Sequence, residues 1–204
     1  MLLTNDNVLY HRGAEGPCSG LCAASFARLA SQYMGNPPMP VEVQIRYARG
    51  DEAAALSELC ARSKAVWGYD PAFMALARAA LEIKPEEIAA GDVWVAEAAG
   101  SVVGVAALAQ GDDPETLDLA KLFVMPGRFR SGIGRTLFAH AVAVARRRGA
   151  RRLTILADPN AAGFYDANGA VKIGDAPSDA IPGRRLPLYD MACLDCGDPA
   201  VLSS

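Results

Sequence analysis

Apolar and polar residues follow two different spacings along this chain from residue 43 onward. Apolar residues three or four positions apart predict helices, whereas alternation and short apolar runs predict strands. We expect helices at residues 51–66, 70–83, 85–88, 133–148 and 161–168, and strands at 43–48, 93–98, 102–110, 117–124 and 153–157, with two last strands flanking residues 175–184. This order predicts a mixed central β-sheet flanked by helices, an α/β (α+β) fold in a single domain.

Local signals place the ends of several elements. Asp70 followed by Pro71 is typical of a helix N-cap with a proline in the first turn. Ala99 and Gly100 predict the turn of a hairpin, and Gly169 predicts the end of the helix before it. Because these signals agree with the spacing of the apolar residues, the element order can be followed through the domain.

The first 42 residues differ in composition from the rest of the chain. They are rich in Gly, Pro, Ser and Asn, and Asn36-Pro-Pro-Met-Pro40 is typical of a linker. We therefore divide the chain into an N-terminal extension at residues 1–42, a domain at residues 43–196 and a C-terminal tail at residues 197–204.

Composition and charge exclude several classes of function. Apolar residues make up 51% of the chain, and a net charge of −3 gives no general attraction to nucleic acid or to a membrane surface. No apolar run reaches the roughly 18 residues of a spanning helix. The first residues lack the basic and apolar regions of a secretory signal. We expect a cytoplasmic protein, monomeric or homodimeric, with no nucleic-acid or membrane partner.

The five cysteines bear on redox state and metal binding. An odd number without regular spacing is typical of reduced thiols. The alternative is a four-cysteine zinc site made by Cys18, Cys22, Cys193 and Cys196, but the first pair lacks the usual Cys-x-x-Cys spacing. We therefore expect free thiols and no metal.

The main chemical signal lies between Leu117 and Leu137. An apolar strand leads through a basic loop to Gly132-Ile-Gly134 and an amphipathic helix. Unpaired N–H groups and the positive end of the helix dipole make such a junction a seat for phosphate. The loop is not a Walker loop, and the dinucleotide fingerprint lacks its third glycine at Leu137. Asp158, about 20 residues further on, keeps dinucleotide binding open as an alternative. A further alternative is a helix start that contains glycine and binds no ligand.

The order Val-x-Pro, Gly132-x-Gly134, a helix, a strand and Asn160-Ala-Ala-Gly-Phe-Tyr165 resembles the GCN5-related N-acetyltransferases over roughly residues 43–193. In that family the glycine loop holds the pyrophosphate of acetyl-CoA, and the strand before it pairs with the pantetheine arm. The resemblance assigns acetyl-CoA binding to Leu122, Phe123, Val124, Arg128, Phe129, Arg130, Ser131, Gly132, Ile133, Gly134, Arg135 and Asn160. Phe129 departs from the pattern, because the family usually has Gln or Arg at that position.

The resemblance also implies catalytic residues. Tyr165 stands where the family carries a tyrosine that protonates the departing thiolate, although a core aromatic would also fit. Asn160 is either the N-cap of its helix or a ligand of the pantetheine amides. Asp118 lies six residues before Val124, the spacing of a catalytic glutamate in histone-type members. Simple alternation puts residues 118, 120, 122 and 124 on one face, where Asp118 could act as a general base. The alternative is a carboxylate in a salt bridge or at a solvated strand end.

Further candidates surround these residues. Glu97 is a weaker candidate for the base, and Trp67, Tyr69 and Phe73 either shape an acceptor pocket or belong to the core. We expect an enzyme that moves the acetyl group of acetyl-CoA to a primary amine of unidentified structure. A catalytically silent acyl-CoA-binding sensor and a dinucleotide-dependent oxidoreductase are the alternatives.

Overall fold

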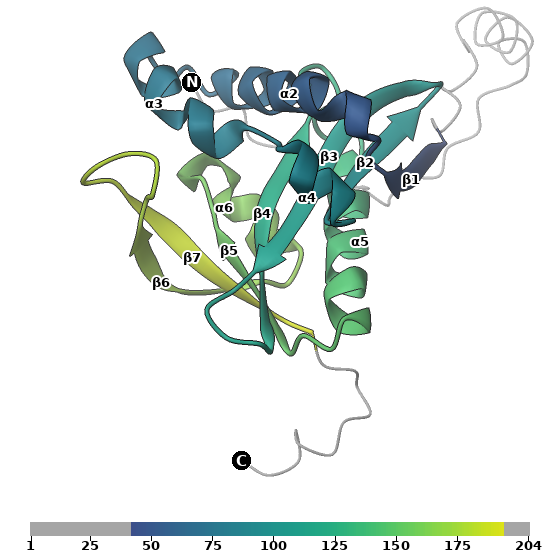
Figure 1. Ribbon diagram of the computed structural model, residues 1–204. Coiled ribbons are helices and arrows are strands. Elements are labelled where there is room, and N and C mark those ends of the chain that lie inside the picture. The colour runs from purple at the N-terminus through teal and green to yellow at the C-terminus, as the bar shows by residue number, and fades with distance from the viewer. Residues whose placement is uncertain (1–41, 194–204) are drawn as a thin grey trace, which may run out of the picture. The chain divides into compact units, whose positions relative to one another are not determined.

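Seven strands form one mixed sheet in this protein, whose computed structural model describes residues 42–193 (Figure 1). The strand order is β1-β2-β3-β4-β5-β7-β6, and only β4 and β5 are parallel neighbours. The strands are β1 Val43–Tyr47, β2 Val93–Ala98, β3 Ser101–Gln110, β4 Thr116–Val124, β5 Arg152–Leu156, β6 Val171–Pro177 and β7 Arg185–Ala192. The predicted fold class is confirmed.

Helices cover both faces of the sheet (Figure 1). The α-helices are α2 Ala53–Ala65, α3 Pro71–Leu81, α4 Pro85–Ala89, α5 Ile133–Arg147 and α6 Ala162–Ala167, with short 3-10 turns η1 Gly50–Glu52 and η2 Pro159–Ala161. One buried apolar cluster joins α2, α3 and α4 to the sheet, and two others join α5 to the opposite face. A Cβ atom at Gly104 would lie 2.8 Å from Leu137 Cδ1, so glycine lets β3 approach α5 closely.

The local signals act as the sequence predicted, with small shifts in the ends of elements. The Asp70 carboxylate accepts a hydrogen bond from Phe73 N at 2.9 Å and caps α3, which ends at Leu81 rather than at residue 83. The β2–β3 hairpin turns at Ala99 and Gly100, whose φ angles are 48° and 74°. The last loop spans only residues 178–184, because Pro177 still pairs with Arg185 across β6 and β7.

A bulge in β4 changes which side chains share a face. Ala107 pairs with Lys121 while Leu108 pairs with Leu119, so Ala120 is an extra residue on β4. Leu119 and Leu122 therefore both pack on the α5 side, while Phe123 packs on the α2 side. The expectation that residues 118, 120, 122 and 124 share one face is wrong, because the extra residue shifts the alternation by one position.

Candidate functional site

The parallel strands β4 and β5 part in the middle of the sheet. Their ladder consists of Thr116↔Arg152, Leu117↔Leu153 and Asp118↔Thr154, and β4 then continues to Val124 without a pairing to β5. The backbone groups of β4 that face this opening can pair with an extended, amide-bearing ligand as a further strand would. The opening leads directly to the glycine loop, because β4 ends just before it.

The glycine loop presents backbone N–H groups at the start of α5. Gly132 is the N-cap of that helix with a φ of 85°, and no side chain caps the helix. The first-turn N–H groups therefore have no partner within the helix. A Cβ atom at Gly132 would meet nothing within 4 Å, so glycine is required there for its backbone conformation rather than for space.

The second glycine has a different role. A Cβ atom at Gly134 would lie 3.4 Å from Phe164 Cε2 and 3.6 Å from Val124 Cγ2, so glycine allows α5 to pack against α6. Three exposed arginines, Arg128, Arg130 and Arg135, surround the turn. The loop therefore combines free donors, the positive end of a helix dipole and exposed positive charge, which together suit a pyrophosphate.

Phe129 stacks on Trp67 instead of presenting a polar group to the loop. Their ring centroids lie 6.5 Å apart with planes 15° apart, and both side chains are exposed, at 40% and 47%. The stack connects the glycine loop to the segment after α2. Trp67 is therefore not a core residue, and a phosphate bound here would depend on backbone and arginine donors.

Tyr165 lies on α6 within an aromatic cluster. Its ring is buried, with ring centroids 5.7 Å from Phe138, 5.1 Å from Phe164 and 5.8 Å from Tyr189. Burial raises the pKa of Tyr165 above its ordinary value, and the negative charge of Asp158 raises it further. The phenol is therefore protonated at neutral pH, and its ring also belongs to the core.

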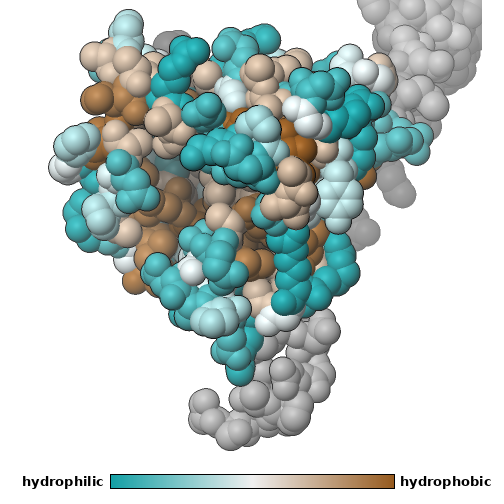
Figure 2. Space-filling model, in the orientation of Figure 1, coloured by the Kyte–Doolittle hydropathy of each residue, from teal (hydrophilic) through white to brown (hydrophobic). Residues whose placement is uncertain are grey.

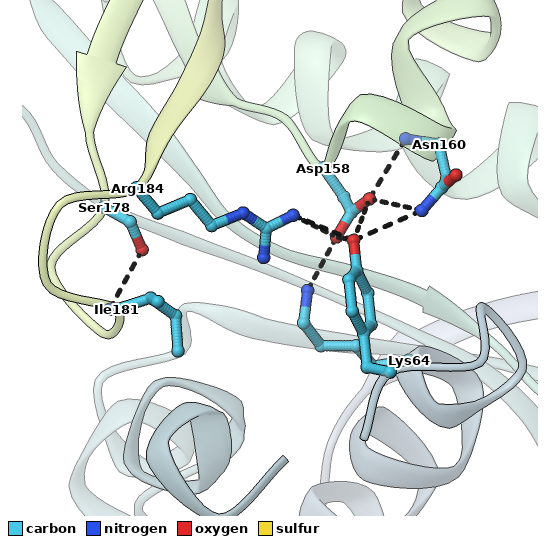
Figure 3. Close-up of polar contacts among 7 residues, drawn as sticks. Lys64, Asp158, Asn160, Ser178, Ile181 and Arg184 are labelled. Carbon is cyan, nitrogen blue, oxygen red and sulfur yellow. Dashed lines mark hydrogen bonds and ion pairs between the residues drawn. The ribbon is translucent and has the colours of Figure 1, made fainter. Parts of the chain in front are cut away.

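The structure reveals a polar cluster around Asp158 that the sequence did not predict (Figure 3). Lys64 Nζ, from the end of α2, lies 2.9 Å from Asp158 Oδ2. The Tyr69 hydroxyl, from the connection to α3, donates to the same carboxylate at 2.8 Å. Arg184, from the β6–β7 loop, donates from Nη2 to the Tyr69 hydroxyl at 2.8 Å and lies 3.5 Å from Asp158 Oδ2. Two segments distant in sequence, residues 64–69 and the β6–β7 loop, thus meet at one carboxylate.

Asn160 takes part in this cluster rather than capping a helix. Asp158 is the N-cap of η2 and accepts from the Asn160 backbone N–H at 3.0 Å, while Asn160 Nδ2 donates to Asp158 at 3.0 Å and to Tyr69 at 3.2 Å. Of the two alternatives for Asn160, the N-cap role is therefore excluded, because Asp158 caps η2 and Ala161 is the N-cap of α6. The Asp158-Pro159 pair carried that capping signal.

Asp158 is held as a carboxylate by its partners. Burial alone would raise the pKa of Asp158, but hydrogen bonds from Lys64, the Asn160 backbone and Tyr69 hold it below its ordinary value. Burial raises the pKa of Tyr69, the Asp158 carboxylate raises it further, and Arg184 opposes both. Both oxygens of Asp158 already accept hydrogen bonds from the protein. Asp158 is therefore poorly placed to take a proton, and equally to bind the ribose hydroxyls of a dinucleotide.

The other acidic candidates have different surroundings. Asp118 is half-buried on the α2 side of the sheet and accepts a hydrogen bond from the hydroxyl of Thr154 on β5. Glu97 forms an ion pair with Arg46 at 2.8 Å, and Arg46 also pairs with Glu52 at 2.7 Å. Glu97 therefore has a structural partner, whereas no ion pair of Asp118 occurs among residues 42–193.

Tyr69 and Phe73 form one wall beside the polar cluster. Their rings stack with centroids 4.1 Å apart, and Phe73 also packs against the apolar cluster on the α2 side, as does Ile181 from the β6–β7 loop. Figure 2 shows apolar side chains gathered in a hollow below α3, over the neighbouring strands. These rings thus serve the core and the site together.

The described part of the chain has neither a cluster of metal ligands nor a membrane-spanning helix. Within the part of the chain that the structure describes, no group of three His, Cys, Asp or Glu residues is placed to hold a metal ion. Cys60 and Cys193 are free and buried, while Cys18, Cys22 and Cys196 lie outside the described residues. Over residues 42–193 no helix is both long enough and apolar enough to cross a membrane.

Comparison with known proteins gives a consistent result. Residues 57–170 match the family model described as "Acetyltransferase (GNAT) family", while no curated protein matches the sequence significantly. The fold is similar to the PaiA N-acetyltransferase of Thermoplasma acidophilum in complex with coenzyme A, with a TM-score of 0.61 and 17% identity over 74% of this chain and 99% of that one.

Two further solved structures share the fold. The putative acetyltransferase YncA of Salmonella typhimurium, solved with acetyl-CoA, gives a TM-score of 0.56 and 20% identity over 78% of this chain and 98% of that one. A GNAT family acetyltransferase of Brucella melitensis in complex with acetyl-CoA gives a TM-score of 0.52 and 23% identity over 74% of this chain and 88% of that one.

Proposed function

Because this chain belongs to the GNAT acetyltransferase family, we propose that it transfers the acetyl group of acetyl-CoA to a primary amine in a ternary complex. The observation that carries the proposal is the parting of β4 and β5 after the pair Asp118↔Thr154, directly before a glycine loop with free N–H groups. An extended thioester with a pyrophosphate needs both features, one for its amides and one for its charge.

Acetyl-CoA is the proposed co-substrate, and solved structures of the same fold contain coenzyme A or acetyl-CoA. The backbone of residues 122–124 would pair with the pantetheine arm. The loop at residues 128–135 would hold the pyrophosphate through its N–H groups and its arginines. Asn160 remains a candidate donor to the pantetheine, although its amide already contacts Tyr69 and Asp158.

The proposed reaction forms one C–N bond and breaks the C–S bond of the thioester. The acceptor ammonium first loses a proton, and the neutral amine then attacks the carbonyl carbon. Collapse of the tetrahedral intermediate expels the thiolate of coenzyme A, which takes a proton from the Tyr165 hydroxyl. The second proton lost by the amine restores the phenol. The Tyr165 phenol is protonated at neutral pH, as a proton donor must be before it acts.

Asp118 is the proposed base that accepts the first proton, directly or through water. It is half-buried and contacts Thr154, and no cation forms an ion pair with it within residues 42–193. Asp158 and Glu97 are less suitable, since each is bound to a cationic side chain. A carboxylate without a fixed cationic partner keeps oxygens available to accept a hydrogen bond from the acceptor ammonium.

The proposal is tested by two measurements on the purified protein. Calorimetry should detect acetyl-CoA binding, and a thiol reagent should report release of free coenzyme A when a panel of primary amines is added. Binding together with amine-dependent thiol release supports an acetyltransferase. Binding without release for any amine would support the acyl-CoA-binding sensor instead, and absence of binding would contradict both.

A further inference from the structure

The polar cluster around Asp158 carries one positive charge in excess. Lys64, Asp158 and Arg184 have side-chain exposures of 15%, 13% and 18%, so two cations and one carboxylate are largely withdrawn from solvent. No other carboxylate forms an ion pair with Lys64 or Arg184 in the described part of the chain. A withdrawn charge without a partner is costly, and an anion placed beside it would be stabilised.

The groups of this cluster that can still form hydrogen bonds are donors. Asp158 accepts from Lys64, Tyr69 and Asn160, so its oxygens are occupied. Arg184 donates only from Nη2, and Lys64 donates only to Asp158, among residues 42–193. In Figure 3 the second terminal nitrogen of Arg184 points away from Asp158, and no dashed line joins it to another of the drawn residues. Guanidinium has five N–H groups and ammonium three, so most of their donors remain available.

The position of the cluster ties it to the proposed reaction. Asp158 caps η2, and the proposed proton donor Tyr165 lies on α6, the helix that directly follows η2. The aromatic wall of Tyr69 and Phe73 lies under both cations, with Arg184 Cζ 4.8 Å and Lys64 Nζ 5.7 Å from the Phe73 centroid. A group bound by the free donors would therefore lie against this apolar wall, beside the segment that leads to Tyr165.

From this arrangement we infer that the acceptor is a primary amine that also carries a carboxylate, which binds to Arg184 and Lys64. The inference rests on the proposed function and names its acceptor class. A carboxylate brings one negative charge, which matches the excess, and its two oxygens suit the planar donors of a guanidinium. Asp158 then serves as a positioning residue that holds the two cations and Tyr69 in place.

Matched acceptors test the inference. L-leucine, L-leucinamide and isopentylamine share a side chain but differ in the carboxylate, as do β-alanine and propylamine. Coenzyme A release is compared at equal concentrations of the neutral amine, so that amine basicity does not enter. We expect the carboxylated member of at least one set to give a kcat/KM about 10 to 100 times that of its partners, the range expected for a charged hydrogen bond.

Variants assign the effect to the cluster. Arg184→Gln should raise KM for the carboxylated amine about tenfold or more and bring the kcat/KM ratio between the carboxylated and the uncharged amine close to one. Arg185→Gln is the matched control, because Arg185 is exposed and its guanidinium donates to the Asp175 carbonyl outside the cluster. Arg184→Lys should recover part of the preference, since it restores charge without the planar donors. Melting temperatures confirm that the variants are folded.

Three outcomes would overturn the inference. The first is that the amide and the simple amine are turned over as fast as the carboxylated amine, or faster. This result would contradict the acceptor class but not the proposed acetyltransferase activity. A carboxylate preference that survives Arg184→Gln would place the anion elsewhere. Absence of both turnover and binding for every carboxylated amine, with binding followed as a thermal shift of the coenzyme A complex, would also exclude this acceptor class. Failure of acetyl-CoA itself to bind would instead contradict the proposed function.

Discussion

Asp118 on β4 accepts a hydrogen bond from the hydroxyl of Thr154, the residue opposite it on β5, and this pair is the last one in the parallel ladder. The two strands separate immediately beyond it. The bulge at Ala120 follows two residues later, where β4 no longer pairs with β5. The proposed base thus lies at the closed end of the opening in which we place the thioester.

Replacing Asp118 tests its role as the base. Asp118→Asn retains an oxygen that can accept from Thr154 but cannot take a proton, so we expect kcat to fall about 10²–10⁴-fold. Thr154→Val is the control, because it removes the hydrogen bond and keeps the carboxylate. We expect that control to retain most of its turnover. A similar loss in both variants would show that the contact matters for structure rather than for proton transfer.

Tyr165→Phe keeps the ring in its aromatic cluster and removes the proposed proton donor. We expect kcat to fall about 10²–10⁴-fold with little change in acetyl-CoA affinity, because the missing proton is needed only as the thiolate leaves. Tyr189→Phe removes the hydroxyl of a neighbouring buried tyrosine and should be nearly neutral for turnover. Steady-state kinetics and calorimetry separate the two effects. Normal kcat in Tyr165→Phe would leave water as the proton source.

Gly132→Ala tests the glycine loop through its backbone. At a φ of +85° an alanine is strained, although space for its Cβ is available, and about 1 kcal/mol of stability should be lost. Relaxation of that strain would turn the N–H groups away from the pyrophosphate, so we expect acetyl-CoA affinity to fall by about tenfold or more. Gly100→Ala, at a φ of +74° in the hairpin turn, should show a similar stability loss and unchanged affinity. Equal affinities in the two variants would argue against the assignment.

The ion pair of Glu52 makes stability depend on pH. The hydrogen bond from Arg46 lowers the pKa of Glu52 from 4.5 to about 2, against the opposing effect of burial. The contribution of Glu52 is therefore complete above about pH 4.5 and is lost as pH falls toward 2. Glu52→Gln should lower the free energy of unfolding by about 1–2 kcal/mol at pH 7, and the difference should shrink on acidification.

Denaturant unfolding at several pH values measures this effect. Glu58→Gln, at an exposed position on α2, is the control for loss of one negative charge and should have little effect at any pH. A difference for Glu52→Gln that stays constant between pH 7 and pH 3 would mean that packing, not ionisation, is responsible.

Deletion of residues 1–40 tests the predicted domain boundary. The linker-like composition of residues 36–40 predicts that the remaining chain folds and binds acetyl-CoA by itself. Melting temperature and coenzyme A release should match those of the full chain. Loss of cooperative unfolding would move the boundary toward the N-terminus, and loss of turnover alone would assign the extension a part in acceptor binding.

The sequence by itself determined the features that depend on neighbouring residues. Asp70 caps α3, Gly132 supplies the left-handed N-cap of α5, and the amphipathic spacing of residues 133–147 gives that helix its buried face. Each of these depends on one or two turns of chain, so the residues themselves carry the signal. The strand before the loop and the tyrosine on α6 could be placed in the same way.

Only the tertiary structure decided the rest. Lys64 and Arg184 are single cations with no local signal, and they become part of a site only because α2 and the β6–β7 loop meet at Asp158. The bulge at Ala120 also depends on the register of β3 against β4, and it moved Asp118 off the face that simple alternation predicts. Such contacts join residues far apart in sequence, and their energies depend on the packing of the whole domain.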